Sequence, residues 1–379
     1  MSRSRSRNGK RRKEKNSGKA LIIVLLLIIL AAGAWFGYKY LQDNNFFKDK
    51  LANTQPEKEE EPPKVVKKLQ IVDEDSKSRP YAVMINNNHA AWPQCGVQDA
   101  YLVYEIVAEG GITRMMALYK DKDTAKIGSI RSARHYFIDY VEENDAIFVH
   151  WGGSPQAYSR IYSGINDIDG IALEGSVFFR DKTLKRDYEH TGFTSMENVK
   201  EYADSKGFTR DTTKDLLLNY SVDEISLEEN ADAQSADKVV IKYSNYHTTS
   251  YEYDEENKVY KRSMSNVANV DLVTGEQYTA KNIIVYDVSN YTLNDGEGKG
   301  RQEINNVGSG SGYYITDGYA VPITWEKTSH SGQTVYKYAN GEEITVNDGN
   351  TFIQIYPTST GDLTITPKPQ EVVENTEQI

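Results

Sequence analysis

The sequence predicts an α/β (α+β) N-terminal domain with a mixed sheet and flanking helices, then a mostly antiparallel β domain, behind a single N-terminal transmembrane helix. Three observations lead to this fold class. A stretch of nineteen residues near the amino terminus carries no charge. Strand-like and helix-like segments alternate over residues 79–230, and strand-like segments alone follow over 236–360. This change of pattern is typical of a mixed domain followed by a β domain.

The amino-terminal segment predicts a membrane anchor. Residues 1–19 carry nine Lys or Arg and one acidic residue, whereas the next nineteen, Ala20 to Tyr38, carry no charge. As a helix this run spans roughly 28 Å, close to the hydrocarbon thickness of a bilayer, and a basic flank stays in the cytoplasm. We therefore predict a cytoplasmic tail over 1–19, a transmembrane anchor in the lipid bilayer over 20–40, and the remaining residues outside the cytoplasm. Cleavage after Ala34, as in a secretory signal peptide, is the alternative.

Charge and cysteine content exclude some classes of partner and scaffold. The chain has a formal charge of −11, and because residues 1–19 contribute +8, the remainder carries −19. Such an acidic ectodomain is repelled by nucleic acid, which is not an expected partner. The one cysteine, Cys95, has no partner in the chain. The extracytoplasmic part is therefore expected to fold without disulfides, which suits a Gram-positive type of envelope.

Composition also suggests where the folded part begins and ends. A charged, proline-containing stretch over 41–78 predicts a linker that holds the folded part away from the membrane. The last residues, 361–379, are polar and contain proline, and predict a flexible tail. About 280 residues lie between these segments, enough for two domains. We place these domains at 79–230 and 236–360.

Turn dipeptides separate the predicted strands. Gly110-Gly111 joins two apolar runs as a hairpin, and Asp317-Gly318 and Asn340-Gly341 supply the positive φ that hairpin tips require. The predicted strands of the first domain cover 80–86, 100–109, 112–121 and 146–151, and those of the second fall within 239–263, 282–288, 312–346 and 351–357.

Three helices are predicted in the first domain from their capping residues and from apolar residues at helical spacing. The first begins after Ser129 or Ser132 and runs to about Glu143, the second begins at Ser154-Pro155, and the third starts at Thr194 and stops at Gly207.

The densest cluster of unusual polar residues lies between 84 and 155, and two arginines within it predict an anion-binding site. Arg131 and Arg134 are three residues apart, so they would share one face at the start of the first helix, beside free backbone N–H groups. Guanidinium groups in this position suit phosphate or carboxylate. The alternative is that these arginines pair with Glu105 and Glu109 in a structural network.

The motif HWGGSP is a second candidate, because a predicted strand ends there at two glycines before a helix, and ligands favour the carboxyl ends of strands. Ser154 is a candidate nucleophile with His150 as its base, but no nucleophile-elbow motif surrounds it, so a helix N-cap is the favoured interpretation. No histidine has a metal-ligand spacing and no glycine-rich loop matches a nucleotide-binding motif, so neither a metal nor a cofactor is expected. The complete set of candidate ligand-binding residues is Asn87, Glu105, Glu109, Arg114, Arg131, Arg134, His150 and Ser154.

Three motifs, EGGITR, RSAR and HWGGSP, with the run that surrounds them from Arg79 to Pro155, resemble DUF3048, a family of domains of unknown function best known from lipoproteins of Gram-positive bacteria. The stretch from 308 to 357 resembles the C-terminal domain of the same family. The resemblance implies a two-domain extracytoplasmic protein and no particular reaction. This chain departs from the family pattern at its front, where a predicted membrane helix replaces a lipobox cysteine, and at Cys95, where serine is expected.

The favoured function is a membrane-anchored, non-catalytic binding or scaffolding module of the cell envelope with an arginine-lined anion pocket. Its expected partner is a cell-wall polymer, a peptide carboxylate or an envelope protein. One alternative is an envelope hydrolase or transferase that uses Glu105 and Glu109, or His150 and Ser154. Another is an ion-pair network without a ligand, with function in protein contacts along the edge strands of the β domain. The sequence leaves open whether the chain is an enzyme.

Overall fold

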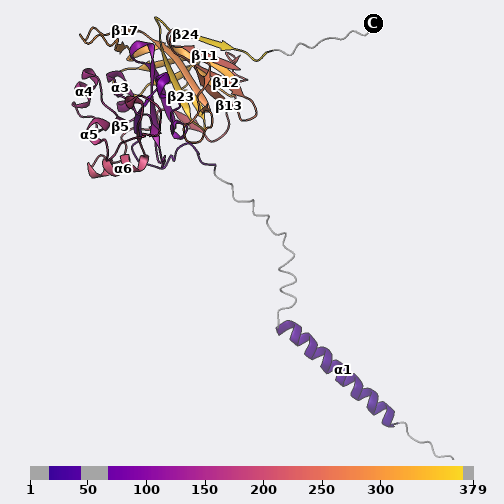
Figure 1. Cartoon of the computed structure of the whole chain (residues 1–379). Helices are drawn as coiled ribbons and strands as arrows, with labels where there is room; N and C mark the ends of the chain where they lie inside the picture. The colour runs from indigo at the N-terminus through magenta and orange to yellow at the C-terminus, as the bar shows by residue number, and fades with distance from the viewer. Residues whose placement is uncertain (1–16, 44–66, 370–379) are drawn as a thin grey trace, which may run out of the picture. The chain divides into compact units, whose positions relative to one another are not determined.

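A computed structural model describes residues 17–43 and 67–369 (Figure 1). The chain divides into two compact units between Val66 and Lys67, and each is described by itself. Residues 1–16 of the predicted basic tail, 44–66 of the predicted linker and 370–379 of the predicted flexible tail lie outside the described residues. The boundary placed between residues 230 and 236 stays a prediction.

The first unit contains helix α1 (Ser17–Asp43), which covers the predicted anchor. Its stretch Ile22–Asp43 has a mean hydropathy of 2.2, and its apolar side chains are exposed within the unit. Twenty-two helical residues span about 33 Å. By length and composition, this helix can therefore cross a bilayer.

The second unit is organised around one large mixed sheet. Its N-terminal strands β1, β2 and β3 are buried along their whole length, as expected of strands covered on both faces. The predicted hairpin at Gly110-Gly111 is present, with φ of 66° and 76° at the two glycines. The strands are, in sheet order, β10 (Gln234–Ser235), β20 (Tyr319–Lys327), β19 (Gly308–Thr316), β16 (Asn282–Val288), β23 (Thr351–Pro357), β2 (Leu102–Val107), β3 (Thr113–Tyr119), β1 (Tyr81–Asn86), β5 (Ile147–His150) and β6 (Asp167–Asp169), with β21 (Val335–Tyr338) paired to β20.

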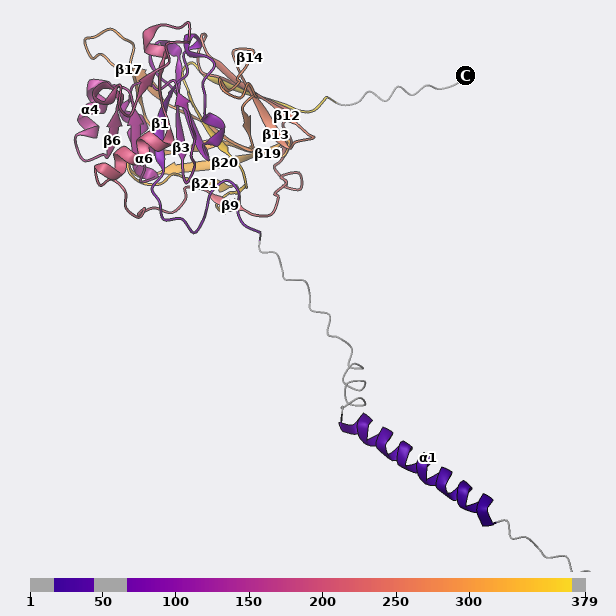
Figure 2. The same cartoon turned by 60° about the horizontal axis from the view of Figure 1, so that its bottom comes forward.

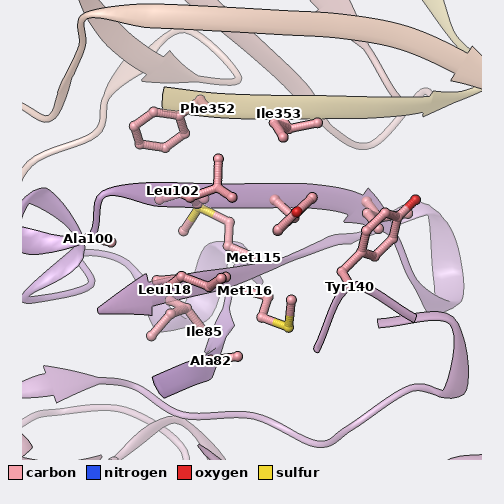
Figure 3. Packing of buried hydrophobic residues seen from close by; sticks show 14 of the residues in the cluster. Ala82, Ile85, Ala100, Leu102, Met115, Met116, Leu118, Tyr140, Phe352 and Ile353 are labelled. Carbon is pink, nitrogen blue, oxygen red and sulfur yellow. The ribbon is translucent and has the colours of Figure 1, made fainter. Parts of the chain in front are cut away.

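Strand β23 joins the two parts of the sequence in this sheet. It lies between β16 and β2 and runs parallel to both. Figure 3 shows Phe352 and Ile353 of β23 above Leu102 of β2, with Met115 and Leu118 of β3 beyond. Strands from the predicted regions 79–230 and 236–360 therefore form one hydrophobic core.

A second, antiparallel sheet covers one face of the large sheet, with Tyr251 of β12 packing on Phe352 at a ring distance of 6.1 Å. Residues 362–366, predicted as part of the flexible tail, form an edge strand of this sheet. Leu363 and Ile365 alternate with polar residues there, a two-residue period that half-buries the strand. The strands are, in order, β14 (Val267–Ala268), β13 (Val259–Met264), β12 (Thr248–Asp254), β11 (Lys238–Lys242) and β24 (Asp362–Thr366), with β15 (Thr279–Ala280) paired to β13.

Within the second unit, helices gather at the end opposite the second sheet (Figures 1 and 2). The α-helices are α3 (His135–Glu143), α4 (Pro155–Ile161), α5 (Gly170–Leu173) and α6 (Met196–Ser205), and the 3-10 turns are η1 (His89–Ala91), η2 (Val97–Asp99), η3 (Glu109–Gly111) and η4 (Tyr188–His190). The remaining strands are β4 (Ile127–Gly128), β7 (Phe179–Arg180), β8 (Gly192–Thr194), β9 (Asn219–Ser221), β17 (Asn290–Thr292), β18 (Gln302–Ile304) and β22 (Thr345–Asn347).

Two of the predicted helix starts are wrong. The first helix begins only after Arg134, because residues 129–133 bond to neighbouring strands: Arg131 N–H donates to Met84 O and Ala133 N–H to Gly152 O. The third is capped by Ser195, since Thr194 belongs to a strand.

The second predicted helix start is correct. Ser154 Oγ accepts from the Ala157 N–H at 3.1 Å, and Pro155 occupies the first helical position.

A buried ion pair ties the helical layer to the large sheet. Lys327 Nζ of β20 lies 2.6 Å from Glu143 Oε2 of α3, and the two side chains are 1% and 0% exposed. Tyr104 OH of β2 donates to the other carboxylate oxygen at 2.6 Å. Because a buried carboxylate is strongly destabilising without such partners, this pair fixes α3 across the sheet.

We predict that Lys327→Met lowers the free energy of unfolding by about 3–5 kcal/mol, because it leaves Glu143 buried without a cation. Denaturation of the full chain in detergent, followed by tryptophan fluorescence, measures the loss. Lys238→Met is the control, since its pair with Glu252 is exposed and should contribute less than about 1 kcal/mol. Equal losses in the two variants would contradict the assignment.

Candidate functional site

The predicted site residues come from segments that meet at one edge of the large sheet. Strands β1, β5 and β6 are parallel, and β2 runs in the same direction because both β1 and β2 are antiparallel to β3. Their carboxyl ends therefore lie at the same edge. The segment 129–134 crosses this edge, accepting from the Trp151 N–H at Arg131 O. Carboxyl edges of this kind commonly bind ligands in open α/β sheets.

Two of the three predicted arginines are held by one carboxylate. Arg134 contacts Glu109 through Nη2 at 2.5 Å and Nε at 3.0 Å, and Arg114 Nη2 contacts the same carboxylate at 2.7 Å. The arginine side chains are only 6% and 9% exposed. Burial alone would raise the pKa of Glu109, but Arg114 and Arg134 hold it well below its usual range. Arg134 and Glu109 thus form a structural ion pair of the kind that the sequence offers as the alternative to an anion site.

Arg131 is in a different environment from the other two arginines. Its Nη2 lies 2.9 Å from Glu189 Oε2, and the two side chains are 23% and 57% exposed. Burial, together with the positive charge of Arg131, lowers the pKa of the adjacent His190. Both effects disfavour the charged form of His190.

Two exposed apolar side chains belong to the segments next to Arg131 and its partner Glu189. Ile171 and Tyr188 are each 66% exposed. A Cβ built on Gly152 would lie 3.5 Å from Ile171 and 3.6 Å from Ser132, so these residues are neighbours. The Arg180 guanidinium carbon lies 4.0 Å from the ring centre of Tyr188 and 3.9 Å from that of Trp151. We call Arg131, Ser132, Gly152, Ile171, Tyr188 and Glu189 the Arg131 surface.

Glu105 and Asn87 do not belong to the Arg131 surface. Both face the second sheet, where Glu105 and Arg262 of β13 form an ion pair of 2.8 Å with both side chains 0% exposed. Burial alone would raise the pKa of Glu105, but Arg262 and His247 lower it well below its usual range. Oε1 of Glu105 also contacts Asn87 (2.9 Å), Thr113 (2.7 Å), Thr249 (3.0 Å) and His247 (3.1 Å).

His150 and Ser154 are engaged elsewhere. His150 is fully buried, with Nδ1 2.9 Å from Gly152 O and Nε2 3.2 Å from Asp167 Oδ2. Ser154 is 1% exposed and caps α4. Since both ring nitrogens of His150 face oxygen acceptors, neither is directed at Ser154 as a general base would be.

Comparison with known proteins gives two family matches. The model of the DUF3048 N-terminal domain, a protein of unknown function, matches residues 69–209, and that of the DUF3048 C-terminal domain matches 239–353. The Bacillus subtilis (strain 168) protein named "Putative lipoprotein YerB" is 31% identical over 287 residues, covering 74% of this chain and 81% of that protein. The crystal structure of the YerB protein from Bacillus subtilis superposes with a TM-score of 0.65 at 28% identity, covering 76% of this chain and 94% of that one. The predicted family and the predicted fold class are thereby confirmed.

We predict that Glu109→Gln destabilises the chain by about 3 kcal/mol at pH 7, because two nearly buried arginines lose their counter-ion. The pKa of Glu109 is lower in the folded state than its ordinary 4.5. Its stabilisation is therefore complete above that value and is lost as the pH falls through the lower folded-state pKa. The difference from the unsubstituted chain should shrink between pH 5 and the acid limit. Denaturation at a series of pH values measures it.

Glu229→Gln provides the matched control, since Glu229 is exposed. A destabilisation by Glu109→Gln that is the same at pH 3 and pH 7 would contradict the electrostatic role.

Proposed function

The chain belongs to the DUF3048 family, and on this premise we propose that it is a membrane-anchored envelope protein whose folded unit lies outside the cytoplasm and acts as a binding or scaffolding module. The observation that carries the proposal is the Arg131 surface. It places an accessible guanidinium at the carboxyl edge of a parallel sheet, with a partner that a ligand can displace.

Helix α1 is the proposed membrane anchor. Its apolar stretch follows the basic residues 1–19, and a basic flank on the cytoplasmic side directs the rest of the chain outward. A relative carries the word lipoprotein in its name. In this chain the one cysteine, Cys95, is fully buried, and burial raises the pKa of its thiol to about 12. A helix therefore suits this chain better as an anchor than a lipidated cysteine.

We predict that protease added to intact protoplasts degrades the folded unit and leaves an amino-terminal fragment of residues 1–19 with α1 protected by the membrane. Immunoblotting with tags at the two ends distinguishes the fragments. Protection of the carboxyl-terminal tag with loss of the amino-terminal tag would mean the opposite orientation, and secretion of the folded unit without α1 would mean cleavage.

The free-energy cost of displacing the carboxylate partner distinguishes the three arginines as ligand-binding groups. An anion at Arg114 or Arg134 would have to displace Glu109, which is 24% exposed but neutralises two nearly buried arginines, and removing it costs about 3 kcal/mol. At Arg131 it displaces Glu189 from an exposed pair that contributes at most about 1 kcal/mol. Arg131 is therefore the proposed ligand contact, and Arg114, Arg134 and Glu109 hold the segment that presents it.

The flanking residues suggest the class of ligand. The Arg131 surface combines a guanidinium with exposed Ile171 and Tyr188, which suits a phosphate or carboxylate carried on an apolar or ring-shaped group. Wall polymers and peptide carboxyl termini both offer this chemistry. A binding role is also favoured over hydrolysis by the engagement of His150, Ser154 and Glu105 in internal bonds.

We predict opposite effects of two substitutions on anion binding. Arg131→Ala should weaken binding about tenfold or more, because it removes a charge-assisted contact. Glu189→Gln should strengthen it, because the competing carboxylate loses its charge. Titration of the full chain in neutral-lipid nanodiscs with poly(glycerol phosphate), and separately with a peptide bearing a free carboxyl terminus, distinguishes the two sources. The backbone N–H of Trp151 bonds to Arg131 O, so the fluorescence change that is lost in Trp151→Phe reports this site and not Trp35, Trp92 or Trp325.

Lys185→Ala is the control, since it removes an exposed cation from the loop just before Tyr188. Unchanged binding in both Arg131→Ala and Glu189→Gln would overturn the proposed site.

A further inference from the structure

A groove of about 710 Å³ lies between the amino-terminal part of the folded unit and the second sheet. One wall is formed by residues 96–99 and 124–126, and the other by residues of 254–261 and 271–279, which include parts of β13 and β15. Its walls come from both family-matched ranges, and it shares no residue with the Arg131 surface. Its volume is in the range of sites for drug-sized ligands.

The charges that line this groove do not balance. Four carboxylates and two lysines line it: Asp99, Asp254, Asp271, Glu276, Lys126 and Lys261. Both lysines are already paired, Lys261 with Asp254 at 2.7 Å and Lys126 with Asp181 at 2.6 Å. The groove therefore has an excess of negative charge that its own lysines do not neutralise.

Asp271 is a nearly buried carboxylate in the wall of the groove. It is only 6% exposed. Its Oδ2 accepts from Gly96 N–H at 2.7 Å and Tyr278 OH at 2.8 Å, and its Oδ1 accepts from the N–H groups of Val273 and Thr274 at 2.7 and 3.1 Å, all of them neutral donors. In the described part of the chain, no Lys, Arg or His side chain forms an ion pair with it. Burial, helped by the negative charge of Asp271, raises the pKa of Tyr278 well above its usual range. The wall of the groove thus holds a desolvated negative charge that dipoles alone stabilise.

Exposed carboxylates stand on either side of Asp271. Asp99 and Glu276 are both exposed at opposite walls. Val259 and Val273 supply apolar surface between the charges, and Val273 is 65% exposed. This combination suits a side chain with an aliphatic stem and a cationic head, as in lysine. Across residues 17–43 and 67–369, no three metal-ligating side chains gather at one point, which favours an organic cation.

We propose that this groove binds a cationic peptide segment. Lysine-like ammonium groups lie at the exposed carboxylates of Asp99 and Glu276, their aliphatic stems lie on Val259 and Val273, and buried Asp271 adds negative potential. This site is independent of the Arg131 surface. The groove offers carboxylates and the Arg131 surface offers a guanidinium, so one molecule of the chain would engage two chemically different groups.

The test is titration of the full chain in neutral-lipid nanodiscs with pentalysine, measured by calorimetry at low and moderate salt. The unsubstituted chain should bind, more weakly as salt rises. Asp99→Asn with Glu276→Gln should weaken binding about tenfold, because two exposed carboxylates are neutralised without disturbing buried Asp271. Glu229→Gln with Asp232→Asn makes the same change of charge at exposed positions outside the groove and should leave binding unchanged.

Three results would overturn the proposal. One is the absence of pentalysine binding by the unsubstituted chain. Another is an equal loss in the two double variants, which would mean attraction by net charge alone. The third is binding of a neutral chito-oligosaccharide in place of pentalysine, which would make the groove a glycan site. Retained binding of anions at the Arg131 surface in the groove variants keeps the two sites distinguishable.

Discussion

A carboxylate with no exposure to solvent, Glu105, sets the architecture of the folded unit. Removing an ion from water costs several kcal/mol unless a counter-ion accompanies it, and the partner of Glu105 is Arg262, 157 residues further along the chain. The second sheet is thereby fixed against β2. The preceding residue, Tyr104, points to the opposite face and bonds Glu143, the partner of Lys327. Two adjacent positions of one strand thus hold both outer layers in place.

Local sequence signals predict the elements well and their long-range neighbours poorly. The hairpin at Gly110-Gly111 and the cap at Ser154 depend on residues within a few positions, and both are present. The run that forms β23 has the pattern of a buried strand, but nothing within it specifies a place between β2 and β16. Parallel neighbours of this kind are joined by distant parts of the chain, so pairing depends on the whole core.

In the candidate site, too, local features are easier to predict from the sequence than long-range contacts. The sequence predicts Arg131 on a helix, whereas the backbone there bonds to Met84 of β1 and to the segment that follows β5. Sequence reasoning also missed Glu189, His247 and Arg262, which are distant in sequence from their partners. Arg262 carried a usable signal, since it occupies an inward position between Tyr260 and Met264 on an alternating strand. A charged residue at such a position requires a buried partner.

Exposure to solvent, more than residue type, decides which charged side chains of this chain can bind a ligand and which support the fold. Arg134 and Arg131 are three residues apart and both contact a glutamate, yet one pair is nearly buried and the other is open to water. The buried pair is too costly to break and therefore serves as support, while the open pair is cheap to exchange for a ligand. The groove follows the same argument with opposite sign, because its two lysines are already paired and Asp99 and Glu276 are exposed. Although the chain outside residues 1–19 has an excess of acidic residues, binding of either kind then depends on which individual charges are exposed enough to exchange water or a weak partner for a ligand.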